Sequence, residues 1–333
     1  MASIHEKEVF SLLIMCYNHE KYIEEAIQSA LAQTYENIEV IICDDCSTDN
    51  SWGIIQLFLP KLQKRFNRVV AFRNSCNMGL VKSFNKMIEE TRGTVIFCLS
   101  GDDMMAENYS ADIMQACLEC PQASVFVTDG YLVDEDAKYS ELDISLLTSF
   151  YVQKPDFCKD TLFERLFWRN CIFAPGVSLR KEVYEKFGLY DAEIWIEDLE
   201  YWLRISRTKE TEFIYLDKKD IYYRKNPDSL TSDAKNESYI ERKLAFLEAM
   251  EKIIDKYGVY VERGEYIKRK WECLLTERRF YQVDMPEEEG RIIRKKLFPF
   301  VMNNWDVLGG RKLITCIHIY IRALLNKVFI ITR

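Results

Sequence analysis

Three pairs of polar residues follow apolar runs in the first third of the chain, and their side chains suit a charged, metal-bearing ligand. The pairs are Tyr17-Asn18, Asp44-Asp45 and Asp102-Asp103. Adjacent carboxylates provide the oxygen ligands that a hard divalent cation takes in proteins, where it also bridges substrate phosphates. Such a cation neutralises the charge that develops on a departing diphosphate. A lone Asp-Asp pair also occurs in solvated loops, so the interpretation depends on the elements that position the pairs.

Two C-x-x-C pairs offer a different chemistry, that of a zinc or thiol site. They are Cys43/Cys46 and Cys117/Cys120, with about 70 residues between the pairs. A zinc ribbon has its two pairs only ~15–20 residues apart, on short turns. Both pairs here begin in apolar segments, where a free cysteine packs as a small hydrophobic side chain. We therefore predict that Cys43, Cys117 and Cys120 pack in the core and that Cys46 fills a loop. A redox or zinc protein is the competing interpretation.

The polar pairs stand at the ends of predicted strands. Short apolar runs predict buried strands, and apolar residues at helical spacing predict the helices between them. We expect strands at 9–16, 38–43, 68–73 and 94–100, with helices at 23–31, 51–63 and 80–91. This alternation implies a largely parallel sheet with helices on both faces. Because ligands bind at the carboxyl ends of such strands, the three polar pairs are expected to form one site.

The rest of the chain predicts a second α/β portion and then a helical region. We expect one strand or a strand pair at 124–134, a helix at 181–187, a helix with an acidic start at 195–204, and closing strands at 213–216 and 221–224. The predicted domains are residues 1–235, with halves 1–103 and 104–235, and a helical C-terminal region, 236–333.

Charge is distributed unevenly along the chain. The net charge is −8, yet residues 291–333 contain nine Lys and Arg against a single acid, Asp306. An acidic body is poorly suited to nucleic acid, whereas a basic end suits an anionic surface. Residues 311–331 have the pattern of a basic amphipathic helix, which binds a membrane surface or packs against protein, including a second copy in a homodimer. Since the N-terminus has no signal-peptide core, we expect a cytoplasmic protein. If residues 311–331 bind a membrane, the protein would be peripheral on its inner face.

Residues 10–51 strongly resemble the opening of the family 2 glycosyltransferases, which have the GT-A fold. The matching motifs include Y-N-H at 17–19 and I-I-C-D-D-C-S-T-D-N-S at 41–51. The resemblance continues in order through N-M-G-L-V-K-S-F-N-K (77–86), G-D-D (101–103), I-E-D (196–198) and Y-R-K-N-P-D-S-L-T-S (223–232). It implies a mixed, largely parallel sheet flanked by helices, with a Rossmann-like nucleotide-binding half (1–103) and an acceptor half (104–235).

The same resemblance implies an activity. The protein would be an inverting glycosyltransferase of the type that assembles bacterial surface polysaccharide, such as capsule or O-antigen. The donor would be a nucleotide-diphosphate sugar, with UDP as the expected nucleotide, and the acceptor a hydroxyl of a glycan or lipid-linked glycan. A Mn²⁺ or Mg²⁺ ion would assist departure of the diphosphate. The alternative is a non-catalytic scaffold that binds a nucleotide sugar and retains the fold.

Donor-side roles follow from the matched motifs. The resemblance implies nucleotide contacts for Tyr17, Asn18, Asp45, Lys82 and Asp102. Asp45 would accept a hydrogen bond from a uracil ring, and Asp44 would give only local support. Asp103 resembles the cation ligand of a D-x-D motif, with Asp102 beside it. In the loop where the family often has a histidine, this chain has Arg224, Lys225 and Asn226, and a basic residue there would meet the diphosphate.

On the acceptor side, Asp198 resembles the general base, with Glu197 as its acidic neighbour. A carboxylate within hydrogen-bond reach can take the proton of an acceptor hydroxyl as that hydroxyl attacks the sugar. Acidic residues in a first helical turn also stabilise the helix through its macrodipole, so capping is the competing interpretation.

Overall fold

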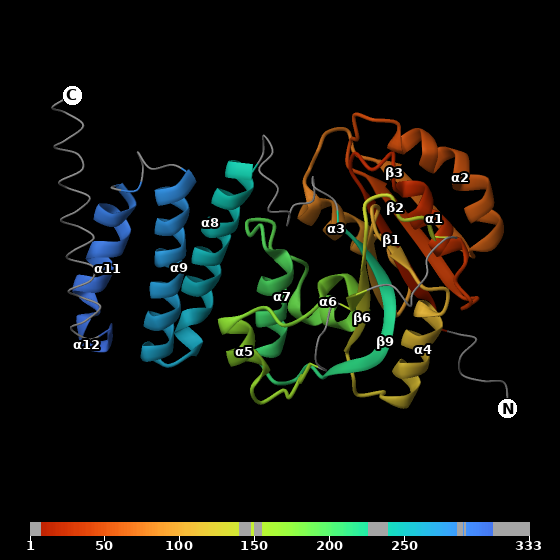
Figure 1. Cartoon of the computed structure of the whole chain (residues 1–333). Helices are drawn as coiled ribbons and strands as arrows, with labels where there is room; N and C mark the ends of the chain where they lie inside the picture. The colour runs from red at the N-terminus through yellow and green to blue at the C-terminus, as the bar shows by residue number, and fades with distance from the viewer. Residues whose placement is uncertain are drawn as a thin grey trace, which may run out of the picture. The chain divides into compact units, whose positions relative to one another are not determined.

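The computed structural model describes residues 8–139, 148–149, 155–225, 239–284, 289 and 291–308 (Figure 1). The chain divides into two compact units, one formed by residues 1–193 with 197–232 and the other by 194–196 with 233–333. The first unit contains the sheet, and the second is helical. The predicted amphipathic segment, 311–331, lies outside the described residues.

One mixed sheet forms the centre of the first unit. In the described residues its strand order is β3-β2-β1-β4-β8-β6-β9-β5, and the short strand β7 (Thr148–Ser149) pairs with β6. The four strands predicted before residue 103 are all present and parallel, as β1 (Phe10–Cys16), β2 (Ile38–Asp44), β3 (Arg68–Arg73) and β4 (Val95–Ser100). Every residue of β1 and β2 is buried, as expected for central strands covered on both faces.

Strand register brings the polar pairs to one edge of the sheet. Cys16 at the end of β1 pairs with Asp44 at the end of β2, and Met15 pairs with Ser100 at the end of β4. The residues that follow these three strands therefore emerge side by side, as the sequence predicts.

Four helices flank this part of the sheet (Figure 1). They are α1 (Ile23–Leu31), α2 (Ser51–Arg65), α3 (Leu80–Glu89) and α4 (Tyr109–Glu119). The buried apolar residues of α1 recur at helical spacing, at Ile23, Ala26, Ile27 and Ala30. Residues of α1, α2 and α4 join those of β1, β2 and β4 in the main apolar core. The predicted fold class, a mixed and largely parallel sheet flanked by helices, is confirmed.

The other half of the sheet contains antiparallel pairs. It consists of β5 (Met104–Met105), β6 (Val125–Val133), β8 (Val177–Arg180) and β9 (Phe213–Arg224). Strand β8 runs antiparallel to β4 and β6, whereas β6 and β9 are parallel. The predicted separate strands at 213–216 and 221–224 are wrong, because pairing with β6 continues through a bulge across the exposed middle of β9. Segment 124–134 forms the single strand β6.

The helices of this half carry the second acidic pair. They are α5 (Leu162–Trp168), α6 (Lys181–Phe187) and α7 (Glu197–Ser206), with a 3₁₀ turn, η4 (Ala174–Gly176), before β8. Helix α6 matches its prediction, and α7 begins two residues later than predicted, so that Glu197 and Asp198 form its first turn. Helix α5 was not predicted.

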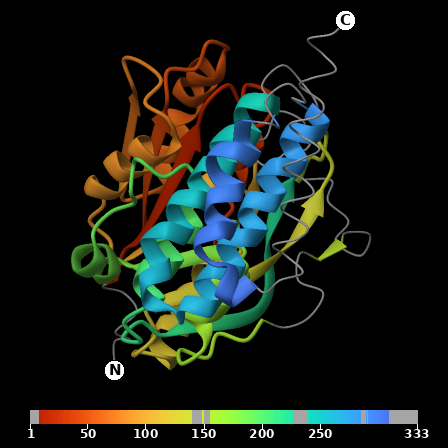
Figure 2. The same cartoon turned by 90° about the vertical axis from the view of Figure 1, so that its left-hand side faces the viewer.

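The second unit is built mainly from two long helices, α8 (Tyr239–Tyr257) and α9 (Arg263–Asp284), which lie side by side (Figures 1 and 2). The shorter elements are η5 (Gly258–Tyr260), the π-helical turn η6 (Ile293–Leu297), α11 (Phe298–Asn303) and α12 (Trp305–Leu308). Lys270 lies 2.9 Å from Glu251 and 2.7 Å from Asp255, so ion pairs tie α9 to α8. Among the described residues, no helix combines the length and apolar character needed to cross a bilayer.

Candidate active site

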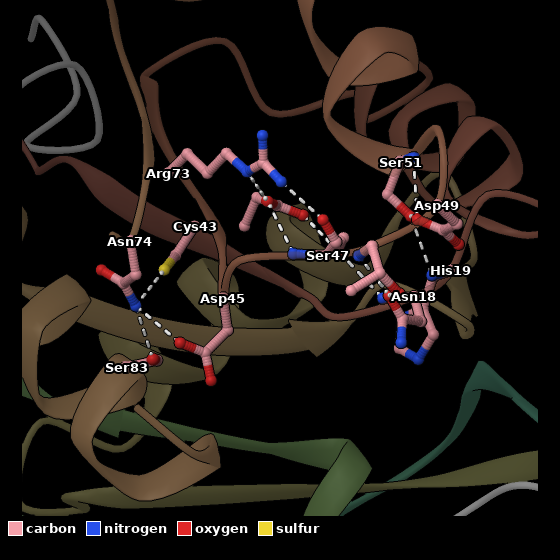
Figure 3. A network of polar contacts seen from close by, with 12 residues as sticks. Asn18, His19, Cys43, Asp45, Ser47, Asp49, Ser51, Arg73, Asn74 and Ser83 are labelled. Atoms are coloured by element: carbon pink, nitrogen blue, oxygen red, sulfur yellow. Dashed lines mark hydrogen bonds and ion pairs between the residues drawn. The ribbon is translucent and has the colours of Figure 1, made fainter. Parts of the chain in front are cut away.

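The turn after β2 is held by Asp44, whose side chain is fully buried. Its carboxylate accepts hydrogen bonds from the backbone N (3.1 Å) and the hydroxyl of Ser47. The Nε of Arg73, at the end of β3, lies 3.0 Å from it. Arg73 also donates to the carbonyl of Ser47, at 2.5 Å (Figure 3). These contacts fit the local, structural role expected for Asp44.

Asn18 ties the end of β1 to the same turn. Its backbone N donates to the Ser47 hydroxyl at 2.9 Å, and its Oδ1 accepts from the backbone N of Thr48 at 2.8 Å. Asn18 has a φ of 56°, a left-handed conformation that asparagine adopts more readily than most residues. The Asn18 side chain therefore stabilises the turn after β2. The neighbouring Tyr17 is 39% exposed.

Asp45 is buried beneath the start of α3. Its Oδ1 accepts hydrogen bonds from the Nδ2 of Asn74 (2.8 Å) and the backbone N of Met78 (2.9 Å). Its Oδ2 accepts from the backbone N of Gly79 at 2.8 Å. With 1% of its surface exposed, Asp45 can meet a nucleobase only if the Met78–Gly79 segment moves. The uracil contact therefore stays a prediction.

Asn74 is a site residue that the sequence reasoning missed. Its Nδ2 contacts Asp45, the Ser83 hydroxyl at 2.9 Å and, more weakly, the Sγ of Cys43 at 3.6 Å (Figure 3). Its Oδ1 accepts from the Nζ of Lys86 at 2.9 Å. The available signal was its position directly after β3, which repeats the pattern of the other polar strand ends.

Lys82 lies apart from this network. Its side chain is exposed in the first turn of α3, and within the described residues no hydrogen bond or ion pair joins it to another candidate residue. Asn85, one turn later, instead exchanges two hydrogen bonds with the backbone of Tyr190, at 2.9 and 3.0 Å. The Lys82 side chain therefore points into solvent, and its predicted contact with a phosphate stays a prediction.

The turn after β4 holds a buried carboxylate with a raised pKa. Asp103 is 3% exposed, and burial, followed by the charge of Asp102, raises its pKa well above its usual range. Asp102 accepts a hydrogen bond from the Ser100 hydroxyl, and its Oδ2 lies 3.9 Å from the Nε2 of His19. A Cβ on Gly101 would lie 2.8 Å from the carbonyl of Met15, so the close approach of β1 requires glycine here.

The Asp102-Asp103 pair fits a divalent cation that is held jointly with a substrate. Within the described part of the chain, no three His, Cys, Asp or Glu side chains are grouped to hold an ion by themselves. Mg²⁺ commonly takes only one or two carboxylates and completes its shell with substrate phosphates and water. A buried carboxylate whose ionisation is opposed by burial and by a like charge is stabilised by such a cation.

The acidic pair of α7 forms a second perturbed site. Both residues are half-buried, and burial raises the pKa of each carboxyl, with the charge of Asp198 adding to the shift at Glu197. The Oδ2 of Asp198 accepts from the Nδ2 of Asn170 (2.9 Å), and its Oδ1 accepts from the backbone N of Leu199 (2.7 Å). A base with a raised pKa is suited to proton transfer near neutral pH. Asn170 lies just after the unpredicted helix α5, and nothing in the sequence singled it out.

The start of α7 lies close enough to β4 for the charge of Glu197 to act on that strand. Burial raises the pKa of Cys98, in β4, to about 12, and the charge of Glu197 contributes to that shift. The start of α7 therefore lies within electrostatic reach of the strand that leads into Gly101-Asp102-Asp103.

The first cysteine of each C-x-x-C pair does not have the properties of a reactive or metal-binding thiol. Cys43 and Cys117 are buried, and burial raises the pKa of each thiol to about 12. Thiolate, the form that binds metal and attacks disulfides, is therefore disfavoured at both positions. Cys117 and its neighbour Cys120 pack in the main apolar core, as predicted.

Comparison with known proteins settles the family. The family model for "Glycosyl transferase family 2" matches residues 11–188, which is more than half of the chain. The chain belongs to this family. The predicted family is thus confirmed.

Similar proteins come from several bacteria. "Glycosyltransferase GlyG" of Streptococcus pneumoniae is 33% identical over 46% of this chain and 47% of its own length. "UDP-Glc:alpha-D-GlcNAc-diphosphoundecaprenol beta-1,3-glucosyltransferase WfaP" of Escherichia coli is 36% identical over 29% of this chain and 36% of its own length. The chain thus spans about half or less of the lengths of these curated relatives.

A solved structure confirms the GT-A-like fold of this family 2 chain. The crystal structure of S. aureus TarS 1–349 in complex with UDP-GlcNAc aligns with a TM-score of 0.57 and 18% identity. The alignment covers 88% of this chain and 80% of that one.

In this family 2 chain, the fold brings together most of the predicted site residues. Asn18, Asp45 and Asp102 follow three adjacent strands, and Asp103 continues from Asp102 into β5. Glu197 and Asp198 form the first turn of α7, and the charge of Glu197 reaches Cys98 in β4. The structure adds Asn74, His19 and Asn170, which contact the predicted carboxylates directly or at 3.9 Å.

Proposed function

We propose that the protein is an inverting glycosyltransferase that moves a sugar from a UDP-sugar to a hydroxyl of a glycan or lipid-linked glycan. The observation that carries the proposal is that the buried carboxylate of Asp103 follows β4 and that the acidic pair Glu197-Asp198 begins a helix whose first charge reaches Cys98 in the same strand. The relative from Escherichia coli supports this choice, since its name specifies UDP-Glc and a diphosphoundecaprenol-linked acceptor.

On the donor side, the proposed contacts follow the strand ends. Tyr17 would pack its exposed ring against the base, Asp45 would accept a base NH once Met78–Gly79 moves, and Asp102 would face the ribose. Asp103, with Asp102, would hold Mn²⁺ or Mg²⁺ together with the diphosphate. When bound, the ion neutralises negative charge on the leaving group.

On the acceptor side, Asp198 would act as the general base. Its Oδ2 is oriented by Asn170, and its raised pKa places the carboxyl closer to neutral pH than an ordinary aspartate. The carboxylate takes the proton of the acceptor hydroxyl as the oxygen attacks the anomeric carbon. Attack from the face opposite the leaving diphosphate inverts the anomeric configuration.

A panel of nucleotide sugars tests the proposal. Purified protein is incubated with each donor, with and without Mn²⁺, and release of the nucleotide diphosphate is measured. We expect turnover of a UDP-sugar that depends on the added ion. Binding of UDP without turnover of any donor, in the presence of lipid-linked and soluble glycan acceptors, would favour a nucleotide-sugar-binding scaffold.

A further inference from the structure

The guanidinium of Arg224 is buried and donates hydrogen bonds to several backbone carbonyls. Arg224 ends β9 and is 2% exposed. Its Nε donates to the carbonyl of Asp102 at 2.8 Å, and its Nη1 donates to those of Glu135 (2.7 Å) and Ala137 (2.9 Å). Its Nη2 lies 3.6 Å from the Sδ of Met104. In this structure Arg224 is therefore occupied by the protein, away from the diphosphate contact that the sequence suggested.

These contacts join three segments that are far apart in sequence. The carbonyl of Asp102 belongs to the turn after β4, and residues 134–137 follow β6. The third segment is the start of α1, where the Tyr22 ring lies 5.0 Å from the Arg224 guanidinium carbon. The Tyr22 hydroxyl donates to the Oε1 of Glu135 at 2.8 Å, so the start of α1 is also joined directly to residues 134–137. Arg224 is thus the common partner of all three.

The backbone of Arg224 also orients the proposed cation ligand. Its N–H donates to the Oδ1 of Asp103 at 2.9 Å. Within the part of the chain that the structure describes, this is the only hydrogen bond to that carboxylate. Strand pairing of Met104 with Tyr222 brings the two residues together. Where the Arg224 backbone lies therefore decides where the Asp103 carboxylate points.

We propose that Arg224 is a positioning residue for the cation and donor site. Its side chain fastens the end of β9 to the Asp102 turn and to residues 134–137, so that its N–H holds Asp103 in the orientation that binds the ion. The inference rests on the proposed role of Asp103 as cation ligand. Partners that orient a metal ligand typically set metal affinity by a factor of about 10–100. Lysine cannot replace Arg224 here, because its single ammonium group lacks the planar fork that reaches several carbonyls at once.

The test is direct measurement of Mn²⁺ binding to the full chain in the presence of UDP, by electron paramagnetic resonance. We expect Arg224→Lys to weaken Mn²⁺ binding about tenfold or more. Arg180→Lys is the matched control, since Arg180 also donates to two backbone carbonyls, of Ala123 and Cys117, each at 2.8 Å. Arg180 pairs with Val95 at the opposite end of β4 from Asp102, so its variant should keep normal Mn²⁺ affinity.

Asp103→Asn separates failure of this inference from failure of the proposed function. If Asp103→Asn weakens Mn²⁺ binding and Arg224→Lys does not, the positioning role is wrong. If Asp103→Asn leaves Mn²⁺ binding unchanged, the proposed cation site itself is wrong, and the inference falls with it. Should circular dichroism show that Arg224→Lys is unfolded, Tyr22→Phe decides, because it removes only the hydrogen bond to Glu135. A several-fold loss of Mn²⁺ affinity supports the inference, and unchanged affinity overturns it.

Discussion

Asp44 is bound by Ser47 and Arg73, whereas the neighbouring Asp45 accepts hydrogen bonds from Asn74 and two backbone N–H groups before α3. Asp103, by contrast, accepts a single hydrogen bond from the described residues and has a raised pKa. At the scale of the residue, therefore, these aspartates differ in how many hydrogen bonds their carboxylate oxygens already accept from the protein. This difference supports the proposal that a cation binds the pair after β4 and not the pair after β2.

Asn170→Ala should shift the pH dependence of the reaction. The hydrogen bond from Asn170 favours the charged form of Asp198 and so lowers its pKa, against the larger effect of burial. Without this bond the pKa rises further, so the base loses its proton only at higher pH. We expect the acid limb of the kcat/KM profile to move to higher pH. Asn108→Ala, at an exposed asparagine before α4, is the control and should leave the profile in place; an unmoved limb in both variants would contradict the assignment of Asp198.

At the scale of the element, Asn74 connects the end of β3 with β2 and α3. It contacts Asp45 after β2, and Ser83 and Lys86 in α3. Because Asp45 in turn holds Met78 and Gly79, the position of the α3 start depends on this one buried amide.

Asn74→Ala should destabilise the fold by about 2–3 kcal/mol, because it removes hydrogen bonds from a buried carboxylate and its neighbours. Urea unfolding measures the change. Asn67→Ala removes an exposed amide that donates to Asn37 at 2.7 Å, and it should change the free energy of unfolding by less than about 0.5 kcal/mol. Equal effects of the two substitutions would show that the Asn74 network does not hold the α3 start.

The strands β1, β2 and β4 could be predicted because each is an apolar run that the fold buries wholly or for the most part. Prediction failed where exposure interrupts an element: the middle of β9, Asp217–Lys219, is exposed and reads as a turn, although sheet pairing continues across it. Helix α5 is only seven residues long, too short for a helical period to stand out. The predicted carboxylates were identified by motif, but Asn74, Asn170 and the side-chain contacts of Arg224 depend on distant strands and loops that local sequence does not reveal.

At the scale of the whole molecule, charge is distributed unevenly between the two units, because the basic C-terminal end belongs to the helical unit. Residues 291–333 are strongly basic, and the rest of the chain is acidic. We propose that the basic end brings the protein to an anionic membrane, where a lipid-linked acceptor would be found.

Removal of residues 311–333 tests this proposal. The segment contains five Lys and Arg, each of which contributes about 1 kcal/mol of attraction near an anionic surface. We expect the full chain to sediment with vesicles containing phosphatidylglycerol and the shortened chain to remain largely in solution. Vesicles of phosphatidylcholine alone are the control and should bind neither strongly. Equal sedimentation of both chains with the anionic vesicles would favour packing of the segment against protein.

The proposed function requires Asp198 to take the proton of the acceptor hydroxyl in a transfer reaction. Turnover by Asp198→Asn, measured with the donor found in the nucleotide-sugar panel, tests it most directly, alongside UDP affinity measured by calorimetry. A general base contributes about 10²–10⁴-fold to a rate, so turnover should fall by that factor while UDP affinity stays within a few-fold of the native value. Turnover that survives Asp198→Asn unchanged would show that Asp198 is not the general base.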